Sequence, residues 1–111
     1  DGEQTRDFVA AMDVARANAL AADAPAANGH AINVGSGVRT SLNTLLAIAG
    51  AALGVGCAPL HAAARTGDIR HSVADISLAR SLLGYIPQTT LRDGLRLTAG
   101  ALREGLVAGA A

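Results

Sequence analysis

Apolar and polar positions follow a helical period most regularly between residues 42 and 53. Leucine and alanine recur there every three or four positions, which gathers them on one face of a helix. Ser41 stands directly before this stretch and Gly54 directly after it, where an N-cap and a left-handed C-terminal residue commonly occur. The pattern therefore predicts an amphipathic helix over residues 42–53.

Two other stretches predict shorter helices with recognisable ends. Asp13 is expected to cap a helix that runs to about Asp23, because Ala24 precedes Pro25 and a residue before proline disfavours helical backbone. Asp75 is expected to cap a second short helix, which Gly84 ends and which carries Leu78, Leu82 and Leu83.

A last helix is predicted after Pro87. Thr90 and Asp93 resemble a capping box at its start, although the usual acid at the fourth position is glutamate. Its inner face is expected to carry residues at helical spacing, namely Leu91, Leu95, Thr98, Leu102 and Leu106.

Short apolar runs predict the strands of the fold. Residues 5–11 read as extended chain, and strands are expected over 31–34, 57–62 and 70–73. Strands and helices in this order predict a small, helix-dominated mixed α/β fold with short strands. The absence of a linker-like stretch predicts one domain over residues 1–111.

Composition indicates that the core is thin. The 111 residues include 26 alanines but only 27 Leu, Ile, Val and Phe residues, and Phe8 and Tyr85 are the only aromatic rings. A short chain buries a small share of its surface, so it depends heavily on large apolar side chains. We therefore expect part of its apolar surface to lie against another polypeptide.

Charge and residue type exclude several functions. The nine basic residues are all arginine, so no lysine is present for a Schiff base, a P-loop or a Tyr-Lys proton relay. Nine carboxylates balance them without a basic stripe, which disfavours nucleic-acid binding. The lone Cys57 fits a reducing compartment, and no stretch reads as a signal peptide or a membrane span, so the expected location is cytoplasmic.

Two potential sites lack the spacing that their chemistry needs. Gly35-Ser36-Gly37 lies where a dinucleotide fingerprint would begin, but position 40 is threonine and no acid occurs between Asp23 and Asp68. Four residues could ligate a metal, but their spacing matches no compact zinc pattern: Cys57, His61, Asp68 and His71. We expect a strand-to-helix turn and no metal site.

The segment Arg65-Thr66-Gly67-Asp68 has residue types that suit a nucleotide. Glycine allows a sharp turn, a guanidinium donates paired bonds to phosphate, and a carboxylate accepts from ribose hydroxyls. Arg6 is a second candidate for the phosphates. On residue types alone, a solvated turn with a weak surface Arg–Asp pair is the favoured explanation of this stretch.

A series of motifs, in order and across nearly the whole chain, resembles the C-terminal part of extended short-chain dehydrogenases/reductases, the NAD-dependent nucleotide-sugar epimerase/dehydratase family. The matching stretches are residues 1–8 (DGEQTRDF), 13–17 (DVARA), 32–37 (INVGSG), 40–42 (TSL), 65–72 (RTGDIRHS), 74–77 (ADIS) and 83–87 (LGYIP). The ordered series is specific to the superfamily and much less specific to one activity.

The resemblance implies a large N-terminal Rossmann domain that binds NAD, followed by a smaller region that holds a nucleotide-diphosphate sugar. This chain is expected to be the smaller region, with residues 1–12 in a truncated hairpin at the domain junction. By resemblance, Arg6 and Arg65 contact the substrate diphosphate and Asp68 bonds the nucleoside ribose. The implied parent is a homodimeric enzyme resembling UDP-glucose 4-epimerase, in which this chain binds no cofactor and is inactive alone.

Departures from the family pattern leave an alternative open. Ala10 and Ala11 stand where larger side chains are usual, and both the glycine fingerprint and the catalytic Tyr-x-x-x-Lys pair are absent, so Tyr85 is not that tyrosine. A non-catalytic helical interaction module descended from the family is therefore the second interpretation.

Overall fold

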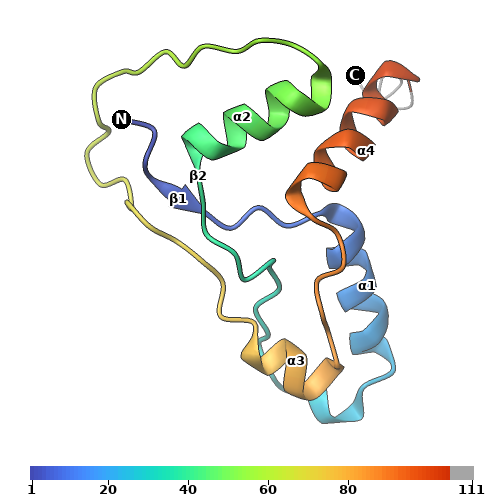
Figure 1. The fold of residues 1–111 in the computed structure, drawn as a ribbon. Coiled ribbons are helices and arrows are strands. Elements are labelled where there is room, and N and C mark those ends of the chain that lie inside the picture. The colour runs from blue at the N-terminus through green and yellow to red at the C-terminus, as the bar shows by residue number, and fades with distance from the viewer. Residues whose placement is uncertain (106–111) are drawn as a thin grey trace.

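The computed structural model describes residues 1–105, which form four α-helices, a single 3-10 turn and two short strands. The elements, in chain order, are β1 (Thr5–Arg6), α1 (Ala11–Ala22), the 3-10 turn (Pro25–Ala27), β2 (Thr40–Ser41), α2 (Leu42–Leu53), α3 (Ser77–Leu83) and α4 (Leu91–Arg103). α2 packs against α4 at one end of the molecule and α1 packs against α3 at the other, with the two strands between them (Figure 1). This helix-dominated arrangement with short strands confirms the predicted fold class.

Within residues 1–105, the sheet consists of β1 and β2. They run antiparallel, with Thr5 opposite Ser41 and Arg6 opposite Thr40. On its other edge Thr5 forms an isolated parallel bridge with His71: the Thr5 amide donates to the Arg70 carbonyl at 2.9 Å, and the Ser72 amide donates to the Thr5 carbonyl at 3.1 Å. Thr5 therefore joins three segments that lie far apart in the sequence.

The prediction of strands over 31–34 and 57–62 was wrong, because neither segment forms a strand. Within 70–73 the predicted strand is reduced to a single bridge at His71. A strand exists only where a second segment supplies its hydrogen bonds. Ile32 and Val34 instead pack their side chains against the core. Residues 57–62 are exposed and pair with no described segment, so their apolar content does not produce a ladder.

The helix-end signals were more accurate. The Ser41 hydroxyl accepts from the Thr44 amide at 3.1 Å, and Gly54 ends α2 in the left-handed conformation, as predicted. The Thr90 hydroxyl accepts from the Asp93 amide at 3.1 Å, but Asp93 bonds the threonine hydroxyl rather than a backbone amide. The capping box is therefore only half formed, because aspartate is one methylene shorter than glutamate.

Asp13 is not an N-cap, which corrects the expectation for α1. The helix begins two residues earlier, at Ala11, and the Asp13 side chain is 1% exposed. Its carboxylate accepts from the amides of Gln88 and Thr89 at 3.1–3.3 Å and from the Arg16 guanidinium at 2.6 Å. Burial alone would raise the pKa of Asp13, but the bonds from Thr89, Gln88 and Arg16 together lower it.

The core lies between α1 and α3. Tyr85 is fully buried there, and its hydroxyl donates to the Gly35 carbonyl at 2.8 Å. Burial and the nearby Asp13 charge raise the pKa of Tyr85, so the phenol keeps its proton. The other buried members of this cluster are Ala17, Ile76, Ala79 and Leu83.

The predicted inner face of α4 is only partly correct. Leu91 and Leu95 are half-buried, whereas Thr98 and Leu102 are exposed. Ala99 is the buried residue of the helix, and Leu106 lies outside the described residues. No helix within residues 1–105 combines the length and the apolar character needed to cross a bilayer.

We predict that Tyr85→Phe lowers the free energy of unfolding by about 1–3 kcal/mol, because the buried Gly35 carbonyl loses its donor. Urea denaturation of the chain, followed by circular dichroism, measures this loss. Thr98→Val is the control, because it removes an exposed hydroxyl that also donates to a backbone carbonyl, that of Gly94. Its free energy of unfolding should change by no more than about 0.5 kcal/mol. Equal effects for the two variants would contradict the assigned role of Tyr85.

We predict that Asp13→Asn destabilises the chain by about 3–5 kcal/mol at pH 7, since the amide group cannot replace a buried, charged acceptor. Because the folded-state pKa of Asp13 is lowered, the carboxylate stabilises the fold above its unfolded pKa of about 3.9. This contribution is lost as the pH falls through the lower, folded-state pKa.

The difference in free energy of unfolding between wild type and Asp13→Asn should therefore be largest at pH 7 and decrease as the pH falls. Denaturation midpoints from pH 7 down to pH ~2.5 measure it, spanning the unfolded carboxyl pKa. Asp23→Asn, at an exposed carboxylate beyond the end of α1, is the matched control. A difference that stays constant with pH would contradict the assignment.

Candidate functional site

The Gly35-Ser36-Gly37 turn is held by a carboxylate of the chain itself. Asp7 accepts from the Ser36 amide at 2.8 Å, the Ser36 hydroxyl at 2.5 Å, the Gly37 amide at 2.9 Å and the Ala74 amide at 3.2 Å. Burial opposes ionisation of Asp7, but these bonds lower its pKa. The amides that a dinucleotide phosphate would need here therefore already have an anionic partner.

Gly35 is required for this approach. A Cβ at Gly35 would lie 2.6 Å from the Ala74 Cβ and 2.7 Å from the Asp7 Oδ2, both too close for a real side chain. Our reading of the sequence did not single out Asp7 for this role. The available signal was its place beside Arg6 in the Thr-Arg-Asp-Phe block, which the family resemblance assigned to the arginine alone.

A long exposed segment carries two of the three predicted binding residues. Residues 54–72 leave the end of α2, pass over that end of the molecule and descend beside the N-terminus toward α3 (Figure 1). Within it, the Asp68 amide donates to the Arg65 carbonyl at 3.2 Å, and Gly67 has a φ of +83°. A positive φ at the third position of a turn favours glycine, which explains Gly67.

Arg6 and Asp68 come together in the structure. The Arg6 Nη2 lies 3.0 Å from the Asp68 Oδ1, and the two side chains are 31% and 51% exposed. The Arg6 Nη1 donates to the Thr5 carbonyl at 2.8 Å and reaches the Arg70 carbonyl at 3.5 Å. β1 thus presents Arg6 to the turn, and the guanidinium bonds three groups of the chain.

Arg65 stands apart from this pair. It is exposed at the first position of the turn, and no hydrogen bond or ion pair engages its guanidinium within residues 1–105. The structure therefore joins two of the predicted residues and leaves the third guanidinium open to solvent at the same turn. Such an open fork can donate two parallel bonds to a phosphate.

Further polar contacts border the turn, and the sequence did not indicate them. Arg70 donates to the Asp1 carboxylate, with the closer pair at 2.8 Å, and the Thr5 hydroxyl lies 2.9 Å from the His71 Nδ1. Both contacts join residues more than 60 positions apart, so no local pattern could have found them. Together they tie the descending part of the segment to the N-terminal strand.

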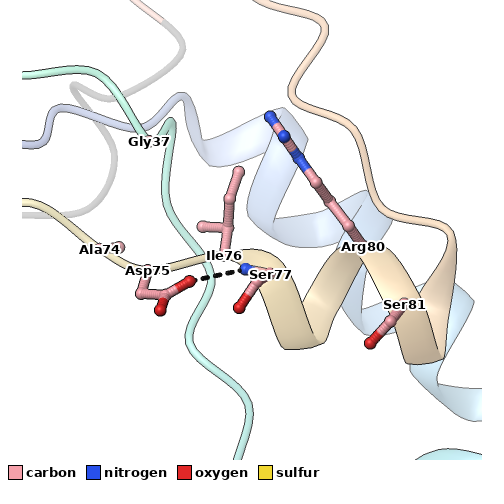
Figure 2. Close-up of a pocket in the computed structure, with 7 residues that line it drawn as sticks. All are labelled: Gly37, Ala74, Asp75, Ile76, Ser77, Arg80 and Ser81. Carbon is pink, nitrogen blue, oxygen red and sulfur yellow. Dashed lines mark hydrogen bonds between the residues drawn. The ribbon is translucent and has the colours of Figure 1, made fainter.

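Two cavities lie elsewhere on the molecule. An open one of about 540 Å³ borders the start of α3, where the Asp75 carboxylate accepts from the Ser77 amide and the Arg80 side chain also lines the cavity (Figure 2). The other, of about 360 Å³, is an apolar groove between residues 8–12 and α4. Neither of these two cavities is lined by Arg6, Arg65 or Asp68, of which Arg6 is half-buried and the other two are exposed.

The residues considered for metal binding do not form a cluster. Cys57 is an exposed free thiol, and His61, Asp68 and His71 are also exposed. Within the part of the chain that the structure describes, no three His, Cys, Asp or Glu side chains gather as ligands.

Sequence comparison identifies relatives of this chain. Residues 1–35 match the model of the NAD dependent epimerase/dehydratase family. The chain is 39% identical to the UDP-glucose 4-epimerase of Mycolicibacterium smegmatis over 94% of its length, and 38% identical to the dTDP-L-rhamnose 4-epimerase of Burkholderia thailandensis over 86%. These matches cover 33% and 26% of the two relatives, so the chain spans about a third of their length or less.

Solved structures agree with the sequences. The UDP-glucose 4-epimerase of Thermotoga maritima with UDP-glucose superposes with a TM-score of 0.86 at 36% identity, over 96% of this chain and 34% of that one. The UDP-N-acetylglucosamine 4-epimerase of Methanobrevibacter ruminantium M1 with UDP-N-acetylmuramic acid superposes with a TM-score of 0.84 at 32% identity. That match covers 94% of this chain and 33% of the epimerase chain. The chain belongs to the NAD-dependent epimerase/dehydratase family, in which it corresponds to the C-terminal part of an extended short-chain dehydrogenase/reductase.

Proposed function

We propose that this chain is the nucleotide-sugar-binding part of an NAD-dependent sugar epimerase that resembles UDP-glucose 4-epimerase. The observation that carries the proposal is the turn at residues 65–68, which carries an open guanidinium at its first position and a carboxylate bonded to Arg6 at its fourth. The names of the relatives support it, since the four reported above are 4-epimerases of nucleotide sugars.

The proposed substrate-binding residues are Arg6, Arg65 and Asp68. Arg65 supplies a planar fork that matches two phosphate oxygens, and Asp68 supplies oxygens that accept from ribose hydroxyls. Arg6 lies in the same site through its bond to Asp68. Holding the nucleotide at this surface orients the sugar, because binding energy from remote groups positions the reacting carbon.

NAD itself does not fit the described residues. The Ser36 and Gly37 amides already bond Asp7, position 40 is threonine, and the chain contains no lysine. We therefore assign the dinucleotide and the oxidation at the sugar to an N-terminal Rossmann domain, and only binding and orientation to this chain. The free Cys57 thiol supports a reducing, cytoplasmic location.

The apolar groove between residues 8–12 and α4 is the proposed contact with that N-terminal domain. Met12 and Leu97, both in its lining, are 66% and 63% exposed. Exposed apolar surface next to a groove is typical of an interaction site. The relatives are about three times as long as this chain, so their remaining length supplies a partner of the required size.

We predict that Arg65→Ala weakens UDP binding by about 1.5–3 kcal/mol, the range for hydrogen bonds to charged groups, or roughly ten- to a hundredfold in Kd. Arg65→Lys should recover part of this, since it keeps the charge and loses the fork. NMR titration of the chain with UDP, followed at the amides of residues 65–68, gives the affinities.

Arg92→Ala, at an exposed arginine of α4, is the matched control and should leave the UDP affinity unchanged. If folded Arg65→Ala binds UDP as tightly as wild type, the phosphate role of Arg65 is wrong.

We predict that the chain binds the part of the M. smegmatis UDP-glucose 4-epimerase that lies outside the matched third, when the two are co-expressed. Leu97→Asp should abolish co-purification, because it places a charge in the apolar groove. Leu60→Asp, at a side chain that is 98% exposed and outside the groove, is the control. Loss of binding by Leu60→Asp alone would refute the groove as the contact.

A further inference from the structure

Residues 56–64 leave their backbone hydrogen-bonding groups unpaired. No backbone hydrogen bond joins this stretch to any other part of the described chain, and every residue in it is exposed. Pairing stops just before it, where the Val55 amide donates to the Gly50 carbonyl at 3.0 Å. A run of exposed, unpaired amides and carbonyls is a template on which another strand can form.

The side chains of this stretch do not guard it against pairing. Soluble proteins commonly protect an exposed strand edge with charged residues. Residues 54–64 contain no Asp, Glu, Lys or Arg, and Leu60 within them is 98% exposed. An uncharged edge of this kind suits the addition of a strand, in which the main chain supplies the bonds.

Pro59 determines which edge of the stretch can accept a strand. In an extended segment the amide and the carbonyl of each residue point to the same edge, and successive residues alternate between the two edges. Proline has no amide hydrogen, so its own edge must face solvent. Residues 57 and 61 share the edge of Pro59, which leaves the other edge for pairing through Ala58, Leu60 and Ala62.

The N-terminus of the chain lies beside this segment. Residues 54–72 curve around the N-terminus before they descend toward α3 (Figure 1). Asp1 is held there, because its two carboxylate oxygens accept from the Arg70 guanidinium at 3.2 and 2.8 Å. Gly2 has a φ of +78° and the Glu3 amide donates to the Asp1 carboxylate, so the backbone turns at this point. A polypeptide joined to Asp1 would therefore start next to the segment.

We propose that residues 58–62 accept a β-strand from the N-terminal part of the enzyme, which pairs with Ala58, Leu60 and Ala62 through their amides and carbonyls. The occupant is the extended polypeptide that leads into Asp1. This inference rests on the proposed function, because it requires such a part; the relatives, about three times as long as this chain, have the length to supply it. The added strand would order the approach to the proposed binding turn.

The test fuses the part of the M. smegmatis UDP-glucose 4-epimerase that lies outside the matched third to Asp1 of the full chain. Amide hydrogen exchange is measured by NMR for the chain alone and for the fusion protein. In the chain alone, the amides of residues 57–62 should exchange freely. In the fusion protein, exchange at Ala58, Leu60 and Ala62 should slow at least about tenfold, and exchange at Cys57 and His61 should change less than about twofold.

Two proline substitutions at neighbouring residues form a matched pair. Ala62→Pro removes an amide on the pairing edge, and His61→Pro removes one on the opposite edge. In the fusion protein, Ala62→Pro should reduce the protection of Ala58 and Leu60 at least about threefold, whereas His61→Pro should leave it within about twofold. Both variants of the chain alone should fold, since neither amide bonds a described residue. Leu60→Asp keeps its amide and should retain the protection.

Free exchange at residues 58–62 in a folded fusion protein would overturn the inference, as would equal effects of the two prolines. Protection that appears in the chain alone and rises with its concentration would show that a second copy supplies the strand instead. If the fusion protein does not fold, the two parts are co-expressed as separate chains, and their failure to associate counts against the pairing. Failure of the chain to bind UDP would refute the proposed nucleotide site and leave this protection unchanged.

Discussion

A buried carboxylate holds the larger part of this fold together. Asp13, on the first turn of α1, accepts the amides of Gln88 and Thr89 in the connection between α3 and α4. Those amides belong to no helix or strand, and a buried amide without an acceptor is costly. Because α4 begins two residues later, this contact ties the start of α4 to α1, and α4 in turn packs against α2.

A second carboxylate repeats the arrangement near the site. Asp7 bonds three amides from the Gly-Ser-Gly turn and from residue 74, while Tyr85 reaches the same turn from the core through the Gly35 carbonyl. The core holds few large side chains, so buried polar contacts join segments that apolar packing alone would leave loosely connected. Arg6 is the last residue of β1 and directly precedes Asp7 in the chain, so its backbone is held on both sides.

The proposed binding surface is held far less firmly than the core. The exposed segment from residue 54 to 72 has few contacts with the helices, and its turn is attached through Arg6. Few buried contacts and exposed backbone are features of the least stable regions of proteins. A surface of this kind suits a role in which a ligand bonds residues from several segments at once.

By itself the sequence determined the features that depend on neighbours within a few positions. Ser41 and Gly54 bound α2 because a cap acts within one turn of helix, and the family motifs identified Arg6, Arg65 and Asp68 as candidates. Tertiary structure alone decided which segments became strands, since a ladder needs a partner, and it turned Asp13 from an expected cap into a buried acceptor. It also paired Arg6 with Asp68 across 62 positions, a contact that no local spacing encodes.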